Sequence, residues 1–522
     1  MDHDLLQFTR LMKRSLESGR IRTKSDLFAE KKSIAAAIGA STIPKNSEIM
    51  AAFGDIDRSK FSDVLRSKPI RTMSGVSVVA LMTKPYDCPH GTCIFCPGGT
   101  RFGTPQSYTG FEPAARRAKL NSYDPYLQVQ ARLKHYLFLG YPPQKIEVIV
   151  IGGTFTTLPE TYRQKFITEI YRALNDFPEQ KAAGIKSLTE EKKENETSGI
   201  RCVALAVETK PERCSDKDIS RMVEYGVTRV EMGVQSVYDS VLKRNNRGHT
   251  IQDVKDSTRR LKDRTFKVDH HIMINLPFSD VDKDINSINA LWEDDTLRPD
   301  AIKIYPTLVI KGTTLYNMWK TGSYKTYPLD TVIDIIARAE TSAPRWLRIM
   351  RVERDIPSNL IEEGVKIPNL RQLVSARLEK MGRKPNDIRS REIGHVPIMM
   401  KPIISINREN YRASSGDEVF ISCDDKANDA IIGFLRLRIP DSRKEALVRE
   451  LHVYGQQKLL LDHSSGGFQH GGIGMSLLEQ AEKIAGEEYS LRRIKVISGV
   501  GVREYYRKFG YKLESNYMVK EL

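Results

Sequence analysis

Three cysteines lie within nine residues of this chain, at Cys88, Cys93 and Cys96 of the segment CPHGTCIFC. Thiolates are soft metal ligands, and a closed zinc site or a four-cysteine cluster takes four protein ligands. No fourth cysteine lies nearby, so a [4Fe–4S] cluster held here would keep one iron free to bind another molecule. His90 offers the alternative of a zinc site, although ligands packed so tightly would strain a tetrahedron. The spacing favours the cluster.

The other cysteines, Cys202, Cys214 and Cys423, are isolated. Six cysteines in 522 residues are too sparse for a disulfide scaffold and are typical of a reducing compartment. No apolar run approaches the ~18 residues of a membrane span, and the N-terminal MDHD lacks the apolar stretch of a secretory signal. We therefore expect a soluble, cytoplasmic protein with no membrane partner.

The chain is strongly basic, with 82 Lys and Arg against 66 Asp and Glu and a net charge of +16. Such an excess is typical of proteins that bind polyanions, most often nucleic acid, although a solvated basic surface is the alternative. Aromatic residues are interspersed among basic ones between Arg101 and Tyr126, where they could stack on unpaired bases: Phe102, Tyr108, Phe111, Tyr123 and Tyr126. These features favour RNA as the partner.

The chain is too long for one core, and its pattern predicts several domains. Residues 1–70 are expected to form short basic helices. Beyond them, apolar β-branched runs predict six strands, at 76–82, 146–151, 202–207, 227–234, 268–274 and 301–304. Strands that alternate with helices predict parallel βαβ units, enough for a partial (β/α)6 barrel of the α/β class. The charged segment 178–199 interrupts this pattern, and we expect it to be an exposed, mobile insertion.

Glycine and polar residues follow several predicted strands. Parallel barrels build active sites at the carboxyl ends of their strands, so these residues and the cysteine segment should converge on one mouth. The cysteine pattern resembles that of radical S-adenosylmethionine (SAM) enzymes, in which the free iron binds the amino and carboxylate groups of SAM. We expect the following residues to bind SAM: Gly152 and Gly153 through the backbone, Glu208 as an acceptor, Lys210 through its charge, and Gln235. Capping of strand ends is the alternative for Thr209 and Ser236.

From about residue 402 the pattern changes to short strands of antiparallel type, at 418–423, 430–438 and 446–454. The segment QHGGIGM (469–475) then opens an amphipathic helix, and glycines at a helix start let backbone N–H groups wrap a pyrophosphate. A strand at 494–498 and a short helix with Tyr505 and Tyr506 follow. This order resembles the coenzyme A site of GNAT-type acetyltransferases, in which the strand before the loop pairs with the pantetheine arm and a tyrosine faces the thioester sulfur.

A cysteine-ligated barrel followed by such a domain resembles the catalytic subunit of Elongator, a family of tRNA wobble-uridine acetyltransferases. The similarity extends from about residue 68 onward. It rests on these segments: QSYTG (106–110), YDPYLQ (123–128), GGTF (152–155), NRGHT (246–250), YPTLVI (305–310), VRELHVYG (448–455) and ISGVG (497–501).

The resemblance implies roles for particular residues. Cys88, Cys93 and Cys96 match the cluster ligands, although the first spacing is one residue longer than in most radical SAM enzymes. Lys145 matches a lysine that contacts acetyl-CoA from the barrel side, and with Tyr505 and Tyr506 it is a candidate catalytic residue. The other expected acetyl-CoA contacts are Glu450, Leu451, His452, Val453, Gln469, Gly472, Ile473, Gly474, Met475 and Tyr506.

The resemblance also implies a reaction. A radical derived from SAM abstracts hydrogen from the methyl of acetyl-CoA, the carbon radical adds to carbon 5 of a uridine in the tRNA anticodon loop, and thioester hydrolysis leaves a carboxymethyl group. The expected partners are tRNA and either a second copy or accessory subunits. The expected domains are a basic helical N-terminal region that contacts the tRNA (1–70), the barrel (71–355), a connecting segment (356–401) and the acetyltransferase domain (402–522). Because the connecting segment has no cysteine and only His395, we expect no zinc there.

Three rival functions remain. A protein lysine acetyltransferase with a structural cluster would transfer acetyl groups without SAM cleavage or RNA. A non-catalytic tRNA-binding scaffold would not need the three cysteines and the 472–474 loop that this chain retains. A methylthiolase would need a second cysteine cluster, which the isolated cysteines do not form.

Overall fold

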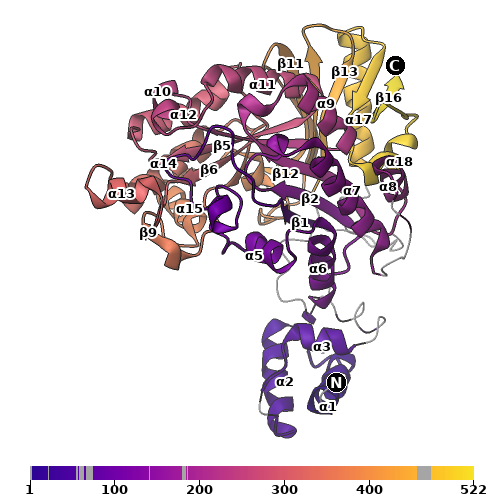
Figure 1. Cartoon of the computed structure of the whole chain (residues 1–522). Coiled ribbons are helices and arrows are strands. Elements are labelled where there is room, and N and C mark those ends of the chain that lie inside the picture. The colour runs from indigo at the N-terminus through magenta and orange to yellow at the C-terminus, as the bar shows by residue number, and fades with distance from the viewer. Residues whose placement is uncertain are drawn as a thin grey trace.

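The computed structural model of the protein describes residues 3–21, 23–40, 42–53, 57, 61, 64–65, 75–139, 141–178, 184, 186–454 and 472–522. Figure 1 shows a small helical lobe at the N-terminus, a central sheet surrounded by helices, and a second sheet at the C-terminal end. No helix in these described ranges is long and apolar enough to cross a membrane.

The N-terminal lobe has three helices, α1 (His3–Glu17), α2 (Lys24–Ala37) and α3 (Asn46–Ala52). Thr23 and Asp26 form a capping box that starts α2, since each side chain accepts a backbone N–H of the other residue. The lobe has a hydrophobic core of its own, with Phe8, Met12 and Ile49 fully buried. Helix α3 contacts α6 of the central part, which connects the lobe to the rest of the molecule (Figure 1).

The central sheet is fully parallel, in the strand order β1-β2-β3-β4-β5-β6-β8. All six predicted strands are present, and a seventh, β8, was missed because it has only four residues, two of them arginines. The strands of this part are β1 (Val76–Met82), β2 (Lys145–Ile151), β3 (Arg201–Thr209), β4 (Arg229–Gln235), β5 (Lys267–Ile274), β6 (Ala301–Pro306) and β8 (Arg348–Arg351), with a small pair β7 (Val309–Ile310) and β9 (Ile361–Glu363).

Helices follow the strands and surround this sheet (Figure 1). They are α5 (Pro113–Leu120), α6 (Pro125–Phe138), α7 (Glu160–Asp176), α8 (Leu188–Asn195), α9 (Asp216–Tyr225), α10 (Asp239–Arg244), α11 (Ile251–Asp263), α12 (Val281–Glu293), α13 (Thr314–Lys320), α14 (Leu329–Ser342), α15 (Leu370–Lys380) and α16 (Ile388–Arg391). Helix α15 packs on α14 within what was expected to be a connecting segment.

Side chains alternate between the two faces of the strands, as the period of two requires. In β2, Ile146, Val148 and Val150 are fully buried against the helices. The half-buried Glu147 lies on the concave face, where it pairs with Arg229 of β4. Charged side chains therefore line part of the concave face, where Arg229 also pairs with Glu231.

The expectation of an exposed, mobile insertion at 178–199 is wrong for residues 186–199. Helix α8 forms there, started by a capping box between Ser187 and Glu190, and it packs on α7. The fully buried Asn195 donates to the carbonyl of Ile200 and accepts the N–H of Cys202, so it fixes the chain that enters β3. Satisfied polar contacts order this charged segment.

Helix α8 also joins two parts of the molecule. Lys192 Nζ donates to Asn516 Oδ1 at 2.6 Å, and Glu196 pairs with Arg503 at 3.0 Å. Both partners belong to the C-terminal part. The charges that suggested a solvated loop instead form a contact between domains.

The C-terminal sheet is mixed, in the order β10-β11-β12-β13-β14-β16-β15. Helix α17 packs against β11, β12 and β13, and the expected apolar face (Leu477, Leu478, Ala481 and Ile484) is buried. The elements are β10 (Ile404–Arg412), β11 (Gly416–Asp425), β12 (Ala430–Pro440), β13 (Ala446–Val453), α17 (Ile473–Lys483) with a π-helical turn (Ile484–Glu488), β14 (Arg493–Val496), η7 (Val500–Val502), α18 (Arg503–Arg507), β15 (Lys512–Glu514) and β16 (Tyr517–Glu521).

Strands β13 and β14 separate along their length. They are parallel neighbours, but only Ala446–Val448 of β13 pairs with β14. The N–H and C=O groups of β13 beyond residue 448 therefore have no partner in β14. This opening is where a strand-like ligand could pair with β13.

Buried ion pairs join the C-terminal sheet to the half-barrel. Arg449 of β13 lies between Asp300, just before β6, and Glu418 of β11, with N–O distances of 2.5 Å to each carboxylate. All three side chains are almost fully buried. The close approach of η7 to β3 adds to this junction, because a Cβ on Gly499 would lie 2.0 Å from the carbonyl oxygen of Val203.

Candidate active site

The three predicted cysteines lie together in the loop after β1, and none forms a disulfide. Cys93 and Cys96 are buried and Cys88 is half-buried. The backbone N–H of Ser107 donates to Cys96 Sγ at 3.0 Å, and Arg247 Nη1 donates to Cys93 Sγ at 3.3 Å. Donors directed at sulfur stabilise thiolates.

Burial, followed by the charge of the neighbouring Cys93, raises the pKa of the Cys96 thiol to about 12. Burial also raises the pKa of Cys88. Metal coordination removes the thiol proton and supplies the positive charge that buried thiolates lack. Three clustered, unbridged thiols, two of them buried and with N–H donors on their sulfurs, fit an iron–sulfur cluster.

His90 is a hydrogen-bond partner of a cysteine. Its Nε2 lies 3.2 Å from Cys93 Sγ, and its Nδ1 lies 2.9 Å from Lys210 Nζ. Burial, followed by the charges of Lys210 and Arg247, lowers the pKa of His90 to about 4, so the ring is neutral at pH 7. With Nδ1 accepting from the ammonium, Nε2 carries the proton and donates to sulfur. His90 thus supports a thiolate instead of acting as a fourth ligand.

Lys210 lies behind the cluster segment and not in the open mouth. It is 4% exposed, pairs with Glu212 at 2.6 Å, and donates to the carbonyl of Arg247 and to His90. These three contacts use all three ammonium protons. The expectation that Lys210 binds the carboxylate of SAM is therefore not supported by this geometry.

Glu208 and the two glycines stand at the carboxyl ends of β3 and β2. Tyr108 donates its hydroxyl proton to Glu208 Oε2 at 2.8 Å, and the N–H of Gly152 lies 3.4 Å from the same oxygen. A Cβ on Gly152 would lie 2.2 Å from Thr83 Oγ1, so packing alone requires glycine there. Gly153 has a φ of 95°, which also favours glycine.

Gln235 ends β4 with an uncommon positive φ of 72°. Its Oε1 is buried and has no hydrogen-bond partner among the described residues. A buried acceptor without a partner is costly unless a ligand or water satisfies it. The ammonium group of SAM has the donors that this oxygen lacks.

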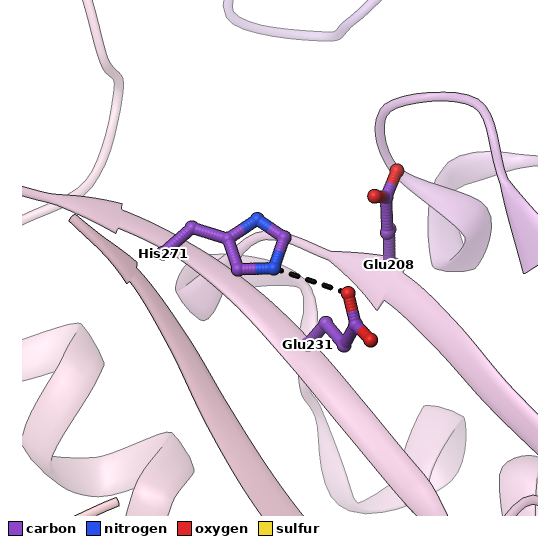
Figure 2. Close-up of side chains that lie close together, drawn as sticks. All are labelled: Glu208, Glu231 and His271. Carbon is purple, nitrogen blue, oxygen red and sulfur yellow. Dashed lines mark hydrogen bonds and ion pairs between the residues drawn. The ribbon is translucent and has the colours of Figure 1, made fainter. Parts of the chain in front are cut away.

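Deeper in the half-barrel, Glu208, Glu231 and His271 bring their polar atoms within 4.8 Å of one another. Figure 2 shows these side chains on neighbouring strands, with His271 Nε2 hydrogen-bonded to Glu231 at 3.1 Å. Glu231 also pairs with Lys303 and with Arg229. Burial would raise the pKa of Glu231, but these cations outweigh it and hold the pKa well below its usual range. Because two cations already neutralise Glu231, the cluster is an ion-pair network and not a cation site.

The residues expected to contact acetyl-CoA lie at the opposite end of the half-barrel. Lys145 begins β2, seven residues before the mouth, a separation of about 20 Å along an extended strand. Burial and the nearby Arg201 lower the pKa of Lys145. A Cβ on Gly501 would lie 2.4 Å from the Cβ of Arg201, which begins β3. This end of β2 and β3 therefore packs against the C-terminal part.

Glu450, Leu451, His452 and Val453 occupy β13 where it leaves β14. Glu450 pairs with Lys267 at 2.7 Å and with Arg436 at 2.9 Å. Burial would raise the pKa of Glu450, but the two cations outweigh it and lower the pKa to about 2. The His452 ring lies 4.3 Å from that of Tyr454.

The first turn of α17 faces the end of β13. Gly472, with a φ of 77°, precedes the helix, and Ile473, Gly474 and Met475 form its first turn. A Cβ on Gly474 would lie 3.7 Å from Val453 and 2.6 Å from the hydroxyl oxygen of Tyr505. The first N–H groups of a helix have no partner within the helix, so those of this turn suit a phosphate. Gln469 lies outside the described residues.

The two predicted tyrosines differ in position. The hydroxyl of Tyr505 reaches the first turn of α17, whereas Tyr506 is 5% exposed and packs between Tyr505 and Tyr511. Burial raises the pKa of both hydroxyls. The hydroxyl of Tyr505 is therefore close to the helix start, whereas the contact predicted for Tyr506 stays a prediction.

Comparisons with known proteins agree with this geometry. Family models match at residues 83–291 (Radical SAM superfamily), 299–380 (Radical_SAM C-terminal domain) and 6–73 (ELP3 N-terminal domain). The tRNA uridine(34) acetyltransferase of Methanocaldococcus jannaschii is 46% identical over 495 residues, covering 92% of this chain and 90% of that protein. Elongator complex protein 3 of Homo sapiens is 41% identical over 532 residues, covering 98% and 96%. The chain belongs to the Elongator complex protein 3 family.

A solved structure of the Elp3 family has the same fold. The archaeal Methanocaldococcus infernus Elp3 with an N-terminal deletion aligns with a TM-score of 0.75 and 41% identity, covering 86% of this chain and all of that one. As a member of the radical SAM superfamily, the protein has a [4Fe–4S] cluster and SAM as its cofactors, and the three thiols of the mouth fit the cluster.

Sequence reasoning missed several residues of this Elp3-family site and misplaced others. Arg247, Arg229 and Lys303 were not singled out, although charged residues at every second position of a buried strand could have signalled an ion-pair network. Tyr108 and Tyr126 were expected to stack on bases, but Tyr108 is half-buried and Tyr126 is buried, and their hydroxyls bond to Glu208 and Asp176. Phe102 and Phe111 are exposed as expected.

Proposed function

We propose that this protein forms 5-carboxymethyluridine at the wobble position of cytoplasmic tRNA from acetyl-CoA, as a SAM-dependent radical enzyme. The proposal is supported by one observation above all: three clustered thiols lie at one end of a half-barrel, and buried ion pairs join this half-barrel to a sheet that carries a helix start suited to coenzyme A. The name of the Methanocaldococcus jannaschii relative, tRNA uridine(34) acetyltransferase, points to the same substrate and to acyl transfer.

The residues of the mouth hold and orient the first cofactor. Cys88, Cys93 and Cys96 would hold the cluster, and Glu208 and Gln235 would accept hydrogen bonds from SAM. When bound, the cluster and SAM supply a radical able to abstract hydrogen from an unactivated methyl group. His90 and Arg247 donate hydrogen bonds to Cys93, and the buried network below Glu208 keeps the site rigid and dry.

The C-terminal residues hold the acyl donor. The first turn of α17 would bind the pyrophosphate, β13 would pair with the pantetheine arm along residues 449–453, and Tyr505 would face the thioester. Lys145 would contact acetyl-CoA from the barrel side. Besides tRNA, accessory subunits or a second copy of the chain are proposed partners.

Anaerobic reconstitution with tRNA, dithionite, SAM and acetyl-CoA tests this function. We expect 5′-deoxyadenosine and carboxymethyluridine from the wild type and neither product from Cys96→Ala. Carboxymethyluridine formed equally well by the variant would rule out the radical route. Acetylation of a protein lysine without SAM cleavage would instead support the rival acetyltransferase.

A further inference from the structure

Phe278 has an unusual backbone conformation at the rim of the mouth. It follows β5 with a φ of 69°, a region that bulky side chains rarely adopt and that glycine adopts freely. Its ring is 37% exposed, and the guanidinium of Arg244 lies 3.5 Å from the ring centroid. A large aromatic residue held in a glycine-like conformation, and left open to solvent, is a feature expected of a binding site.

The Arg244–Phe278 pair is fixed to the segment that carries the cysteines. The fully buried Asn245, next to Arg244, donates to the carbonyl of Pro277 at 2.8 Å, which positions Phe278. The carbonyl of Asn245 also accepts the N–H of Ile94, between two of the cysteines, at 3.3 Å. The pair and the cysteine segment therefore belong to one hydrogen-bonded unit.

The chemistry of the pair selects its ligand. A ring with a guanidinium on it offers a flat surface on which planar nucleobases stack, and the cation attracts the adjacent phosphate. A lysine side chain, the substrate of the rival function, would be repelled by Arg244. Exposed carbohydrate or lipid would leave the charge of Arg244 without a partner.

We propose that Arg244 and Phe278 form a stacking platform for one unpaired nucleobase of the anticodon loop, next to the base that enters the mouth. This inference rests on the proposed function, because it assumes an RNA substrate. Stacking the neighbouring base on a platform tied to the cysteine segment would hold the target uridine unstacked and in register with the cluster.

Fluorescence of 2-aminopurine tests the platform. The probe is an anticodon stem-loop RNA with 2-aminopurine on either side of the wobble position, bound to the holoenzyme. We expect quenching at one of these positions with the wild type, and its loss in Phe278→Leu with roughly 5- to 100-fold weaker binding. Phe278→Trp should keep both the quenching and the affinity of the wild type. Arg244→Gln should reduce the log–log salt slope by about 0.7.

Two controls separate the possible outcomes. Phe138→Leu changes another exposed phenylalanine, on α6, and should bind as the wild type does. Cluster absorbance and thermal unfolding of Phe278→Leu should match the wild type. Unchanged quenching and affinity in Phe278→Leu would overturn the platform while leaving the function intact. A wild type that binds no anticodon RNA would overturn both.

Discussion

The two ends of the half-barrel are stabilised in different ways. At the carboxyl ends of the strands, loops carry the thiols and several non-glycine residues with positive φ, such as Ser107, Gln235 and Asn275. At the amino ends, buried ion pairs centred on Arg449 and Asp300 join the C-terminal sheet. Strained loops are typical of ligand sites, whereas paired buried charges fix one arrangement of the parts. The first end has the features of a ligand site, and the second end fixes the C-terminal sheet relative to the half-barrel.

Of the variants that test this difference between the two ends, Arg449→Met should lower stability the most. The substitution leaves the carboxylates of Asp300 and Glu418 buried without their main partner, which costs about 3–5 kcal/mol of unfolding free energy. Chemical denaturation followed by circular dichroism measures the loss. Arg412→Met is the matched control, because Arg412 pairs with Asp417 and Asp441 in solvent and should cost less than about 1 kcal/mol. Equal losses in the two variants would show that the junction does not depend on buried charge.

The junction should also weaken in acid. The pKa of Glu450 is about 2 in the folded protein and near 4.5 in the unfolded chain, so its contribution is complete above pH 4.5 and is lost as the pH falls toward 2. Relative to the wild type, Glu450→Gln should be less stable by about 3 kcal/mol at pH 7, and this difference should vanish near pH 2. Denaturation at a series of pH values measures the difference. A gap that stays constant with pH would contradict the role of Lys267 and Arg436.

Tyr505 and Tyr506 allow a test of the C-terminal site in which the expected effect is smaller. Tyr505→Phe removes the hydroxyl that faces Gly474 and should slow tRNA-dependent release of coenzyme A about tenfold, as expected for one lost hydrogen bond. Tyr506→Phe changes a core residue and should leave the rate within about twofold. Thiol release assays compare the variants at equal protein stability. Slower release by Tyr506→Phe than by Tyr505→Phe would reverse this assignment.

The sequence predicted local features better than contacts between distant segments. The six strands followed from β-branched apolar runs, and the cysteine mouth followed from spacing alone. Helix α8 was mistaken for a loop because its charges satisfy partners more than 20 residues away, although the capping box of Ser187 and Glu190 was visible. Lys210 was placed in the mouth because sequence position gives the end of a strand and not the direction of a side chain.

The structure also distinguishes residues that were equally good candidates from the sequence alone. Tyr505 and Tyr506 were equal candidates until the packing of α18 showed which hydroxyl reaches α17. Of the aromatic residues expected to stack on bases, Tyr108 and Tyr126 direct their hydroxyls to Glu208 and Asp176, whereas Phe102 and Phe111 are exposed. Phe278 gave no signal at all, because its backbone conformation cannot be read from its neighbours in sequence.

The most direct test of the open mouth is electron paramagnetic resonance of the reduced, anaerobically reconstituted protein with and without SAM. We predict the signal of a [4Fe–4S] cluster that changes when SAM is added, because one iron has no protein ligand. A mononuclear metal signal, or a cluster signal that SAM leaves unchanged, would contradict the account.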